Sequence, residues 1–561
     1  MGSNHDLNLE KERLLIDDFD DESCLVKFLS AAGPSEVVAS AAENVGLSTS
    51  RKVGLGQNDG NGFESGSKVP ESFCIEHHEQ SGSGESKTYD LKDDDLLISA
   101  ILKSKNFRPT SKISICRSKH SSTRKIQKGS CKLPFRSLKR GGGKCSNPCQ
   151  RTVLSWLLHS GVLSLNEVIQ YRDRKTDSVL KEGFVTCDGI LCKCCDEVIS
   201  ISKFKSHASF RHKHPCLNLF MESGKPFSLC QLEAWSAEYK ARKGAPRTVQ
   251  IEEMDEYDNS CGCCGDGGDL LCCDSCPSTF HLECLYIQEM PEGNWHCPQC
   301  TCQICGSGVN QREALPSSNA LKCSQCYNQY HEPCAEKQGI KIDMASDTWC
   351  CTMTCQQVYL GLQARIGLIN LLSDGLHWTL LKCTDGNQKV HSAQSFLALK
   401  AECNLKLVVA LKMMEEYFIR MVDPTTGVDM IPQLVYNWSS KFARVDYYGF
   451  YTAVLEKNDT VIALASIRIH GATVAEMPFA TTCSKYRRQG MFRRLLHAIE
   501  LMLKSLKVKM LVISSIPSTV ETWKVGFGFA DLEECDKRSL SKVKLMVVPG
   551  TEYLKKDLCE N

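Results

Sequence analysis

Hydrophobic and polar positions alternate most regularly in the last two hundred residues of the chain. Alternating or continuously apolar runs predict strands at 448–457, 460–471, 472–483, 508–517 and 541–550. The run 487–506 repeats apolar side chains every three or four positions, which predicts a helix whose buried face holds Phe492, Leu495, Leu496, Ile499, Met502 and Leu503. Another helix should begin near 518, with Ser518 or Thr519 as its N-cap. Strands that alternate with helices indicate an α/β domain over residues 357–555.

The N-terminal part of the chain has a different pattern. Residues 1–90 are rich in Ser, Gly, Asn, Asp and Glu, so they offer too little apolar surface to offset the entropy of ordering, and we expect them to be disordered. Segment 91–150 carries a basic block, which the net charge of +1 for the whole chain conceals. A nuclear localisation signal is the favoured interpretation of this block, and contact with DNA phosphates is the weaker one.

Cysteine usage indicates where the protein works. The chain has 561 residues, enough for about three or four domains, and 34 cysteines. Its start, "MGSNHDLNLEKERLL", is charged and lacks the apolar core of a signal peptide, and no run is apolar enough to span a membrane, so no membrane contact is expected. In a reducing compartment such cysteines bind metal more often than they bind one another.

A cysteine-dense block contains two sets of eight metal ligands. The first set has the Cys-x2-Cys pairs and the single His that two interleaved tetrahedral zinc sites require, and it consists of Cys261, Cys264, Cys273, Cys276, His281, Cys284, Cys297 and Cys300. Its His comes fifth in order, whereas a RING finger has it fourth, which argues against a ubiquitin ligase. The second set consists of Cys302, Cys305, Cys323, Cys326, His331, Cys334, Cys351 and Cys355. Cys351 is preferred to Cys350 because Trp349 then precedes it as Trp295 precedes Cys297. Four zinc ions are therefore expected.

The stretch "CGCCGDGGDLLCCDSCPSTFHLECLYIQEMPEGNWHCPQC" resembles the plant homeodomain (PHD) finger over its whole length, which gives PHD finger 1 at 258–301 and a PHD-like finger 2 at 302–356. The resemblance implies that finger 1 binds the N-terminal tail of a core histone. Asp266, Asp269 and Asp274 would line the peptide groove and suit an unmodified ammonium or arginine; ordinary solvated turn residues are the alternative. Finger 2 lacks the Asp-Gly-Gly-Asp stretch, so a purely structural role remains open for it.

A smaller group of ligands lies upstream. Cys192, Cys195, His207 and His212 have the spacing of a single Cys2His2 site that would hold a fifth zinc ion, with His214 and Cys216 competing for the last position. Packing without metal is the alternative. The surrounding segment resembles the tify-domain-binding (TDBD, Jas-like) region, which implies a small α+β module that docks transcriptional co-regulators. Residues 151–240 are called the docking region below.

The C-terminal domain has the element order of the GCN5-related N-acetyltransferase (GNAT) fold, which it resembles. The pyrophosphate turn of that family becomes Arg487-x-x-Gly490-x-Phe492 here, with Phe where the family has a small residue. The resemblance implies binding of acetyl-CoA by Phe479, Ala480 and Thr481 and by Arg487, Arg488, Gln489, Gly490, Met491 and Phe492. A basic helix start without cofactor is the alternative reading of this turn.

Acetyl transfer to lysine needs a general base, because the amine is protonated near neutral pH. Glu476 precedes Arg487 by the interval that the resemblance assigns to that base; a strand-edge carboxylate is the alternative. Taken together, the chain resembles the plant nuclear PHD-finger acetyltransferases of the increased-DNA-methylation group. That resemblance implies a nuclear histone acetyltransferase linked to transcription and DNA demethylation, with a non-catalytic chromatin adaptor as the rival interpretation.

Overall fold

The computed structural model describes the chain from Arg151 onward. The described residues are 151–173, 176–208, 215–244, 256–309, 320–340, 342, 348–384, 394–423, 425–548 and 550–558. Both N-terminal segments of the sequence analysis, residues 1–90 and 91–150, lie outside them. The chain divides into two units, and every described residue belongs to the unit formed by Met1–Ile16 and Lys92–Asn561.

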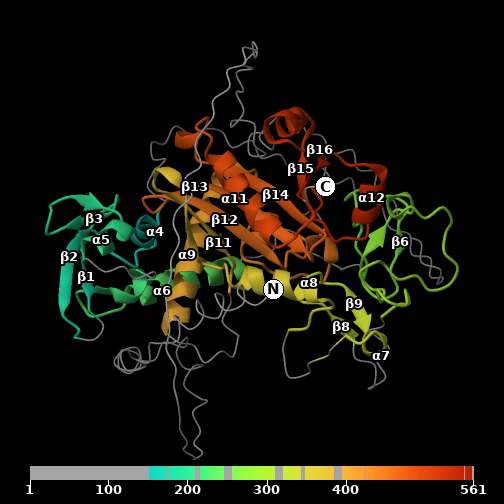
Figure 1. The fold of residues 1–561 in the computed structure, drawn as a ribbon, viewed down its shortest axis with the longest axis horizontal. Coiled ribbons are helices and arrows are strands. Elements are labelled where there is room, and N and C mark those ends of the chain that lie inside the picture. Colours follow the sequence, from blue (N-terminus) through green and yellow to red (C-terminus); the bar gives the residue numbers. More distant parts are fainter. Residues whose placement is uncertain are drawn as a thin grey trace, which may run out of the picture. The chain divides into compact units, whose positions relative to one another are not determined.

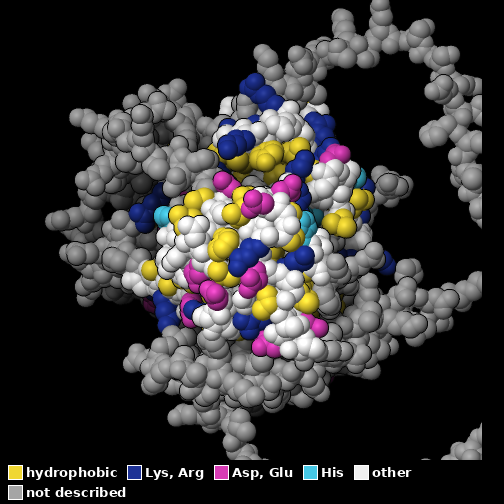
Figure 2. Space-filling view, turned by 90° about the vertical axis from the view of Figure 1, so that its left-hand side faces the viewer, with side chains coloured by type: hydrophobic (Ala, Val, Ile, Leu, Met, Phe, Trp, Pro, Cys, Tyr) yellow, Lys and Arg dark blue, Asp and Glu magenta, His cyan; other side chains and the backbone are white. Residues whose placement is uncertain are grey.

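The docking region is a small α+β module, as expected. Its antiparallel five-stranded sheet has the order β4-β3-β2-β1-β5, with β1 Val168–Arg172, β2 Val179–Val185, β3 Ile190–Cys192, β4 Val198–Ile199 and β5 Leu219–Met221. The helices are α4 Val153–His159, α5 Ile201–His207 and α6 Phe227–Lys243 (Figure 1). Helix α4 starts at a capping box, because the side chains of Thr152 and Ser155 each accept a hydrogen bond from the other's backbone N–H. On this side of the molecule, hydrophobic and charged side chains are mixed across the surface that is visible (Figure 2).

Each finger contains little regular structure. Finger 1 has one two-stranded sheet, β6 Leu271–Cys272 with β7 Thr279–Phe280, and finger 2 has β8 Ala320–Lys322 with β9 Gln329–His331, followed by α7 Glu332–Lys337. The hydrophobic core of finger 1 consists mainly of its cysteines, together with Leu270 and Phe280. So small an apolar core is insufficient by itself to hold a domain of this size, which is why metal ligands are needed.

The C-terminal domain is built on an eight-stranded sheet of order β10-β11-β12-β13-β14-β15-β17-β16 (Figure 1). The strands are β10 Ile369–Leu371, β11 Leu376–Leu381, β12 Phe450–Lys457, β13 Thr460–His470, β14 Val474–Thr482, β15 Met510–Ser515, β16 Ala530–Asp531 and β17 Glu552–Asp557. The strands predicted at 448–457, 460–471, 472–483 and 508–517 are confirmed. All neighbours pair antiparallel except β14 and β15, which are parallel.

One expectation for the end of the chain is wrong, and a second is correct for the helix but not for its type or its N-cap. Residues 541–548 form no strand, and β17 is the strand that pairs with β15 instead. The segment expected to start a helix at Ser518 or Thr519 is helical over 517–527, but as a 3-10 turn at Pro517–Thr519 that leads into a π-helix at Thr522–Gly526. The Thr519 hydroxyl donates to the carbonyl of Ile516 and caps nothing. Apolar runs of this length are compatible with loops, strands or helices, so long-range packing decides between them.

The remaining helices cover the sheet: α8 Met353–Gln363, α9 Gln394–Tyr417, α10 Met430–Val435, α11 Met491–Ser505 and α12 Glu534–Leu540. Helix α11 lies against β12, β13 and β14, and all six apolar positions predicted for its buried face are buried. Among the described residues, no helix has the length and apolar character needed to cross a bilayer.

Buried polar contacts join the modules to the C-terminal domain. Arg444 lies between Asp258, at the start of finger 1, and Asp423; its Nε is 3.0 Å from Asp258 Oδ2, and its Nη1 is 2.5 Å from Asp423 Oδ2. On the docking region, Trp438 Nε1 donates to the hydroxyl of Tyr239 on α6 at 2.9 Å. The fingers and the docking region are therefore both fastened to the same domain.

Candidate zinc, histone-tail and cofactor sites

The structure brings together the sixteen finger cysteines and histidines in the groups that the spacing predicted. Finger 1 groups Cys261, Cys264, His281 and Cys284, and separately Cys273, Cys276, Cys297 and Cys300. Finger 2 groups Cys302, Cys305, His331 and Cys334, and separately Cys323, Cys326, Cys351 and Cys355. Within each group the ligand atoms lie within 4.8 Å of one another. Thiolate and imidazole in this arrangement fit structural zinc.

The cysteine that joins this cluster of finger 2 is Cys351, which the sequence suggested as seventh ligand, and not Cys350. Cys351 is buried, and its Sγ is 3.6 Å from Cys326 Sγ and 3.7 Å from Cys355 Sγ. Cys355 lies in the first turn of α8, whose N-cap hydroxyl, from Thr352, accepts a hydrogen bond from the Cys355 N–H. The irregular Cys-x3-Cys spacing of this pair therefore reflects a helix that starts between the two ligands.

The upstream cluster differs from the expected set in one member. Cys192, Cys195 and His207 are brought together as predicted, and Cys194 joins them. His212 lies outside the described residues. Cys194 stands in the stretch "CKCC" beside the expected ligands, but the Cys-x2-Cys spacing favoured Cys192 and Cys195 over it.

The three acidic residues expected to line the peptide groove of finger 1 are exposed. Asp266 and Asp269 lie in the loop between the first two ligand pairs. Asp274 is also tied to its own finger, because its Oδ2 accepts a 2.6 Å hydrogen bond from the backbone N–H of Trp295. A tail that binds here would therefore meet two carboxylates on one loop and a third that helps fix the turn.

The turn before α11 has left-handed backbone at Arg488 (φ 59°) and Gly490 (φ 69°). Gly490 is the N-cap of α11 and provides no side-chain cap for the first-turn amides, and no acidic residue lies in that first turn. The helix dipole and uncapped amides suit an anion at this place. Arg487 points back from the turn: its Nε donates to the Thr482 carbonyl at 3.2 Å, and its guanidinium lies 4.9 Å from the Tyr417 ring centroid.

Phe492 does not obstruct this turn. Its side chain is fully buried and packs edge-to-face on Trp523 and Phe527, with ring centroids 6.0 and 5.7 Å away. The last position of the motif therefore faces the core of the domain, where a large residue is accommodated. The departure from the family pattern at this position changes core packing and leaves the surface of the turn unaltered.

The parallel strands β14 and β15 separate beside the turn. They pair only at Val474, Ala475 and Glu476, and two residues, Met477 and Pro478, face the single Ile467 of β13 in a β-bulge. Beyond the bulge, Phe479, Ala480 and Thr481 stay paired with β13 but have no partner on β15. The hydroxyls of Thr481 and Thr482 are buried without a hydrogen-bond partner among the described residues.

Glu476 is a buried member of an ion-pair network. Its Oε1 accepts from Arg468 Nε at 2.6 Å and from His470 Nε2 at 2.9 Å, and its Oε2 accepts from the Met546 N–H at 2.7 Å. Burial alone would raise the pKa of Glu476, but the charge of Arg468 and the His470 hydrogen bond outweigh it and lower the pKa to about 2. A general base works best with a pKa near the working pH, so these contacts lend no support to that role.

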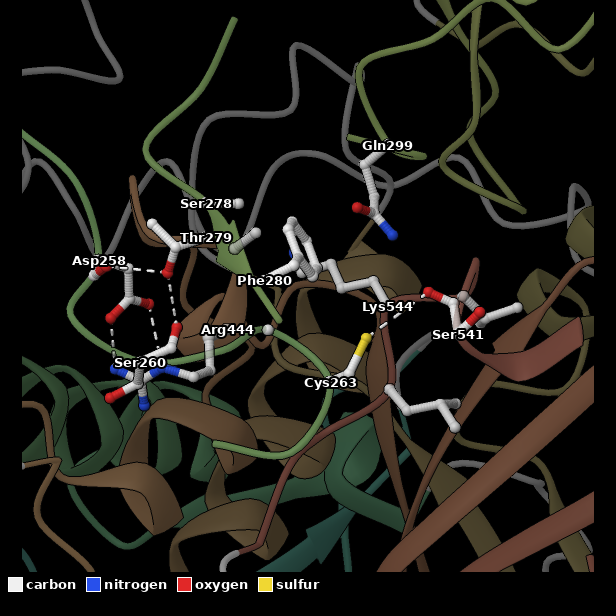
Figure 3. A pocket seen from close by; sticks show the side chains of 14 residues that line it. Asp258, Ser260, Cys263, Ser278, Thr279, Phe280, Gln299, Arg444, Ser541 and Lys544 are labelled. Atoms are coloured by element: carbon white, nitrogen blue, oxygen red, sulfur yellow. Dashed lines mark hydrogen bonds and ion pairs between the residues drawn. The ribbon is translucent and has the colours of Figure 1, made fainter. Parts of the chain in front are cut away.

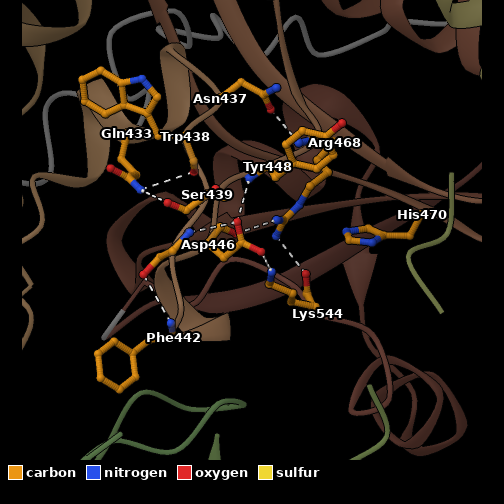
Figure 4. Close-up of polar contacts among 12 residues, drawn as sticks. Gln433, Asn437, Trp438, Ser439, Phe442, Asp446, Tyr448, Arg468, His470 and Lys544 are labelled. Atoms are coloured by element: carbon orange, nitrogen blue, oxygen red, sulfur yellow. Dashed lines mark hydrogen bonds and ion pairs between the residues drawn. The ribbon is translucent and has the colours of Figure 1, made fainter. Parts of the chain in front are cut away.

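The partners of Glu476 escaped the sequence analysis. Arg468 also donates to the carbonyls of Asp446 (3.1 Å) and Lys544 (2.8 Å), and Lys544 pairs with the Asp446 carboxylate (Figure 4). Burial lowers the pKa of His470. The sequence signal for these partners is the two ionisable residues Arg468 and His470, spaced two apart in the largely apolar strand "VIALASIRIH".

Both fingers contact the domain close to this network. In finger 2, Gln325 Nε2 donates to the carbonyl of Ile469 at 2.9 Å, and the Tyr327 ring lies 6.4 Å from that of His470. Finger 1 faces loop 541–548, which carries the Met546 N–H to Glu476. Figure 3 shows the crevice between them, with Phe280 of finger 1 opposite Lys544.

Three family models match the chain: Tify domain binding domain over residues 183–234, PHD-finger over 261–300, and the C-terminal domain of Increased DNA methylation 1 over 418–557. The chain is similar to a human H3 lysine-36 specific histone-lysine N-methyltransferase, 62% identical over 89 residues, 15% of this chain and 3% of that protein. It is also 44% identical over 57 residues to the human Autoimmune regulator, 10% of each. Among solved structures, Tetrahymena GCN5 is 15% identical with a TM-score of 0.23, covering 32% of this chain and 96% of that one. A TM-score this low supports no argument, so the GNAT-like assignment of the C-terminal domain rests on the order of its own helices and strands.

These findings define a multidomain PHD-finger protein with a docking module and a C-terminal α/β domain, and they indicate zinc binding and chromatin reading. The chain is a close homologue of Increased DNA methylation 1 of Arabidopsis thaliana, to which it is 49% identical over 503 residues. The match covers 88% of this chain and 42% of that protein, so the chain spans about two fifths of its relative's length.

Proposed function

We propose that this protein is a nuclear chromatin regulator that reads a core-histone tail through its fingers and transfers an acetyl group from acetyl-CoA to a histone lysine. The observation that carries the proposal is the separation of β14 from β15 beyond Glu476, together with the left-handed turn that starts α11, whose N-cap residue Gly490 makes no side-chain cap hydrogen bond. A cofactor whose extended arm is joined to a diphosphate would fit these two features.

The residues of the chain fit acetyl-CoA in three respects. The first-turn amides of α11, from Met491 onward, and the basic surface of the turn would hold the diphosphate. The edge of Phe479–Thr481 that faces away from β13, and the Thr481 hydroxyl, which has no hydrogen-bond partner within the described part of the chain, would hold the pantetheine arm. The burial of Phe492 leaves room at the turn. When bound, acetyl-CoA would supply the acetyl group as a thioester.

The arrangement of the fingers supports a joint action of reading and transfer. Finger 1 is held to the C-terminal domain by the buried Arg444, and finger 2 contacts β13 at Ile469. A tail bound on finger 1 would therefore be presented at high local concentration to the neighbouring domain. The name of the Arabidopsis relative concerns DNA methylation, and we extend it to a role here in transcription and DNA demethylation, with co-regulators bound at residues 151–240.

A second candidate function is a chromatin reader without catalysis. The observation that favours it is the state of Glu476, whose two oxygens are taken by Arg468, His470 and the Met546 N–H. For Glu476 to act as the base, this buried ion pair would have to open.

Calorimetry with acetyl-CoA tests the proposed cofactor site. Gly490→Asp places a carboxylate at the turn, and Gly161→Asp is its matched control, because both glycines have left-handed backbone (φ 69° and 74°) and open space around an added Cβ. Asp tolerates this conformation, so charge is the main effect at the turn. We expect Gly490→Asp to raise the dissociation constant at least tenfold, about 1.4 kcal/mol, and Gly161→Asp to leave it unchanged. No binding by the parent protein would end the acetyl-CoA proposal.

Turnover separates the two candidates. The parent protein is incubated with acetyl-CoA and peptides of the core-histone tails, and acetylated lysine is measured by mass spectrometry. Acetylation that is lost in Gly490→Asp and kept in Gly161→Asp supports the transferase. Acetyl-CoA binding without any acetylation supports the non-catalytic reader.

A further inference from the structure

Four metal-ligating side chains converge in the docking region, away from both fingers. Cys192 ends β3, Cys194 and Cys195 follow in the turn towards β4, and His207 is the last residue of α5. Cys192 Sγ lies 3.2 Å from Cys194 Sγ and 3.8 Å from His207 Nδ1. The Sγ atoms of Cys194 and Cys195 are each 3.6 Å from that same nitrogen.

The three sulfur–nitrogen separations are those of ligands around one tetrahedral zinc ion, and the Cys192–Cys194 sulfur separation is shorter. Zinc–ligand bonds of about 2.3 Å to sulfur and 2.0–2.1 Å to nitrogen place two sulfurs about 3.8 Å apart and a sulfur and nitrogen about 3.6 Å apart. The finger sites have the same geometry: in finger 1, His281 Nδ1 is 3.3 Å from Cys264 Sγ and 3.8 Å from Cys284 Sγ. All three histidines, including His331 of finger 2, turn Nδ1 towards their cysteines.

Ordinary packing does not account for this convergence. Cys194, Cys195 and His207 are exposed, so no hydrophobic core gathers them. Thiols are weak hydrogen-bond donors and gain little from one another. Thiolates and an imidazole, by contrast, are the ligands that zinc prefers in closed structural sites.

We propose that Cys192, Cys194, Cys195 and His207 bind a structural zinc ion that fastens α5 to β3. Helix α5 has only seven residues, too few to be stable alone, and a single buried side chain, Phe204. The zinc ion therefore anchors its C-terminal end.

The opposite end of α5 contacts the C-terminal domain. Ser202 donates from its backbone N–H (2.9 Å) and its hydroxyl (2.5 Å) to the two carboxylate oxygens of Asp459, in the turn between β12 and β13. Because the helix is short, a metal that fixes one end also positions the other. Zinc binding in the docking region thereby helps to hold this module against the C-terminal domain.

The test is the zinc content of the full-length protein, measured by mass spectrometry of the metal after exhaustive dialysis. We expect five ions in the parent, four in the fingers and one here, and four in Cys194→Ser. Cys187→Ser, which removes an exposed cysteine of the same region outside the cluster, should keep five. His212→Ala should also keep five, because Cys194 completes the site.

Hydrogen exchange provides a second readout that does not depend on counting metal. In Cys194→Ser the amides of α5 should exchange faster while those of both fingers stay unchanged, which also shows that the variant folds. Four ions in the parent would overturn the proposal. So would a loss of one ion in His212→Ala with five retained in Cys194→Ser.

Discussion

Replacing Glu476 by Gln should destabilise the C-terminal domain, whether or not Glu476 takes part in catalysis. The amide removes the negative charge opposite Arg468, which is 1% exposed. It also has a single acceptor oxygen, so its NH2 group must face either the Met546 N–H or the pair of donors from Arg468 and His470. Breaking a buried ion pair from one side costs about 3–5 kcal/mol.

The shift in the pKa of Glu476 gives a second value for the stabilisation that its carboxylate contributes to the folded domain. Folding lowers the pKa of Glu476 from 4.5 to about 2, which corresponds to about 3 kcal/mol. Because the folded-state pKa is the lower one, this stabilisation is fully present above pH 4.5 and is lost as the pH falls towards 2. Glu476→Gln should therefore remove part of the acid sensitivity of the parent protein.

Urea denaturation followed by tryptophan fluorescence, to which the buried Trp523 contributes, measures the effect. The matched control is Asp374→Asn, because Asp374 also pairs with an arginine, Arg494, at 2.6 Å, but is 61% exposed. Exposed pairs contribute little, so its unfolding midpoint should stay close to that of the parent.

If the free energy of unfolding of Glu476→Gln lies within about 1 kcal/mol of that of the parent, this reasoning is refuted, because breaking a buried ion pair costs more than that. The comparison also matters for enzymology. If acetyl transfer is lost together with this stability, the loss reflects the buried network; a base is indicated only if transfer falls while the variant remains folded.

Two further predictions concern the site and its link to the fingers. Phe492→Ala should lower the free energy of unfolding by about 3–5 kcal/mol and leave the acetyl-CoA dissociation constant within twofold, because the ring lies in the core; denaturation and calorimetry check both. Arg444→Met leaves the carboxylates of Asp258 and Asp423 buried without their cation, which should weaken the attachment of finger 1 to the C-terminal domain. Hydrogen exchange around Asp258 should then be faster. Adding Asp258→Asn and Asp423→Asn should restore protection, and no change in exchange for Arg444→Met would contradict the role of this pair.

The contact between finger 1 and the C-terminal domain is polar and buried, which has a consequence for regulation. The network from Arg468 reaches loop 541–548 through Lys544, and the same loop faces finger 1. If finger 1 moved when a tail binds, loop 541–548 would move with it and shift the partners of Glu476. This coupling needs no long path, because the loop contacts both.

Local patterns in the sequence determined much of this protein. The sixteen finger ligands follow from spacing alone, because each zinc knuckle is a local structure whose ligands must be a few residues apart. The strands β12 to β15 and the buried face of α11 follow from periodicity, since side-chain direction repeats with the backbone. The resemblance to PHD fingers and to the GNAT order was carried by these same residues.

Only the tertiary structure decided the surroundings of the candidate chemistry. Glu476 stood at the interval of a base, but Arg468 and His470 from the next strand and Met546 from a loop seventy residues away set its pKa. The sequence suggested that Phe492 could obstruct the turn, but its side chain is buried in the core. Cys194 is a candidate ligand because α5 places His207 close to it. Charge, burial and metal geometry depend on which distant residues meet, and spacing along the chain does not contain that information.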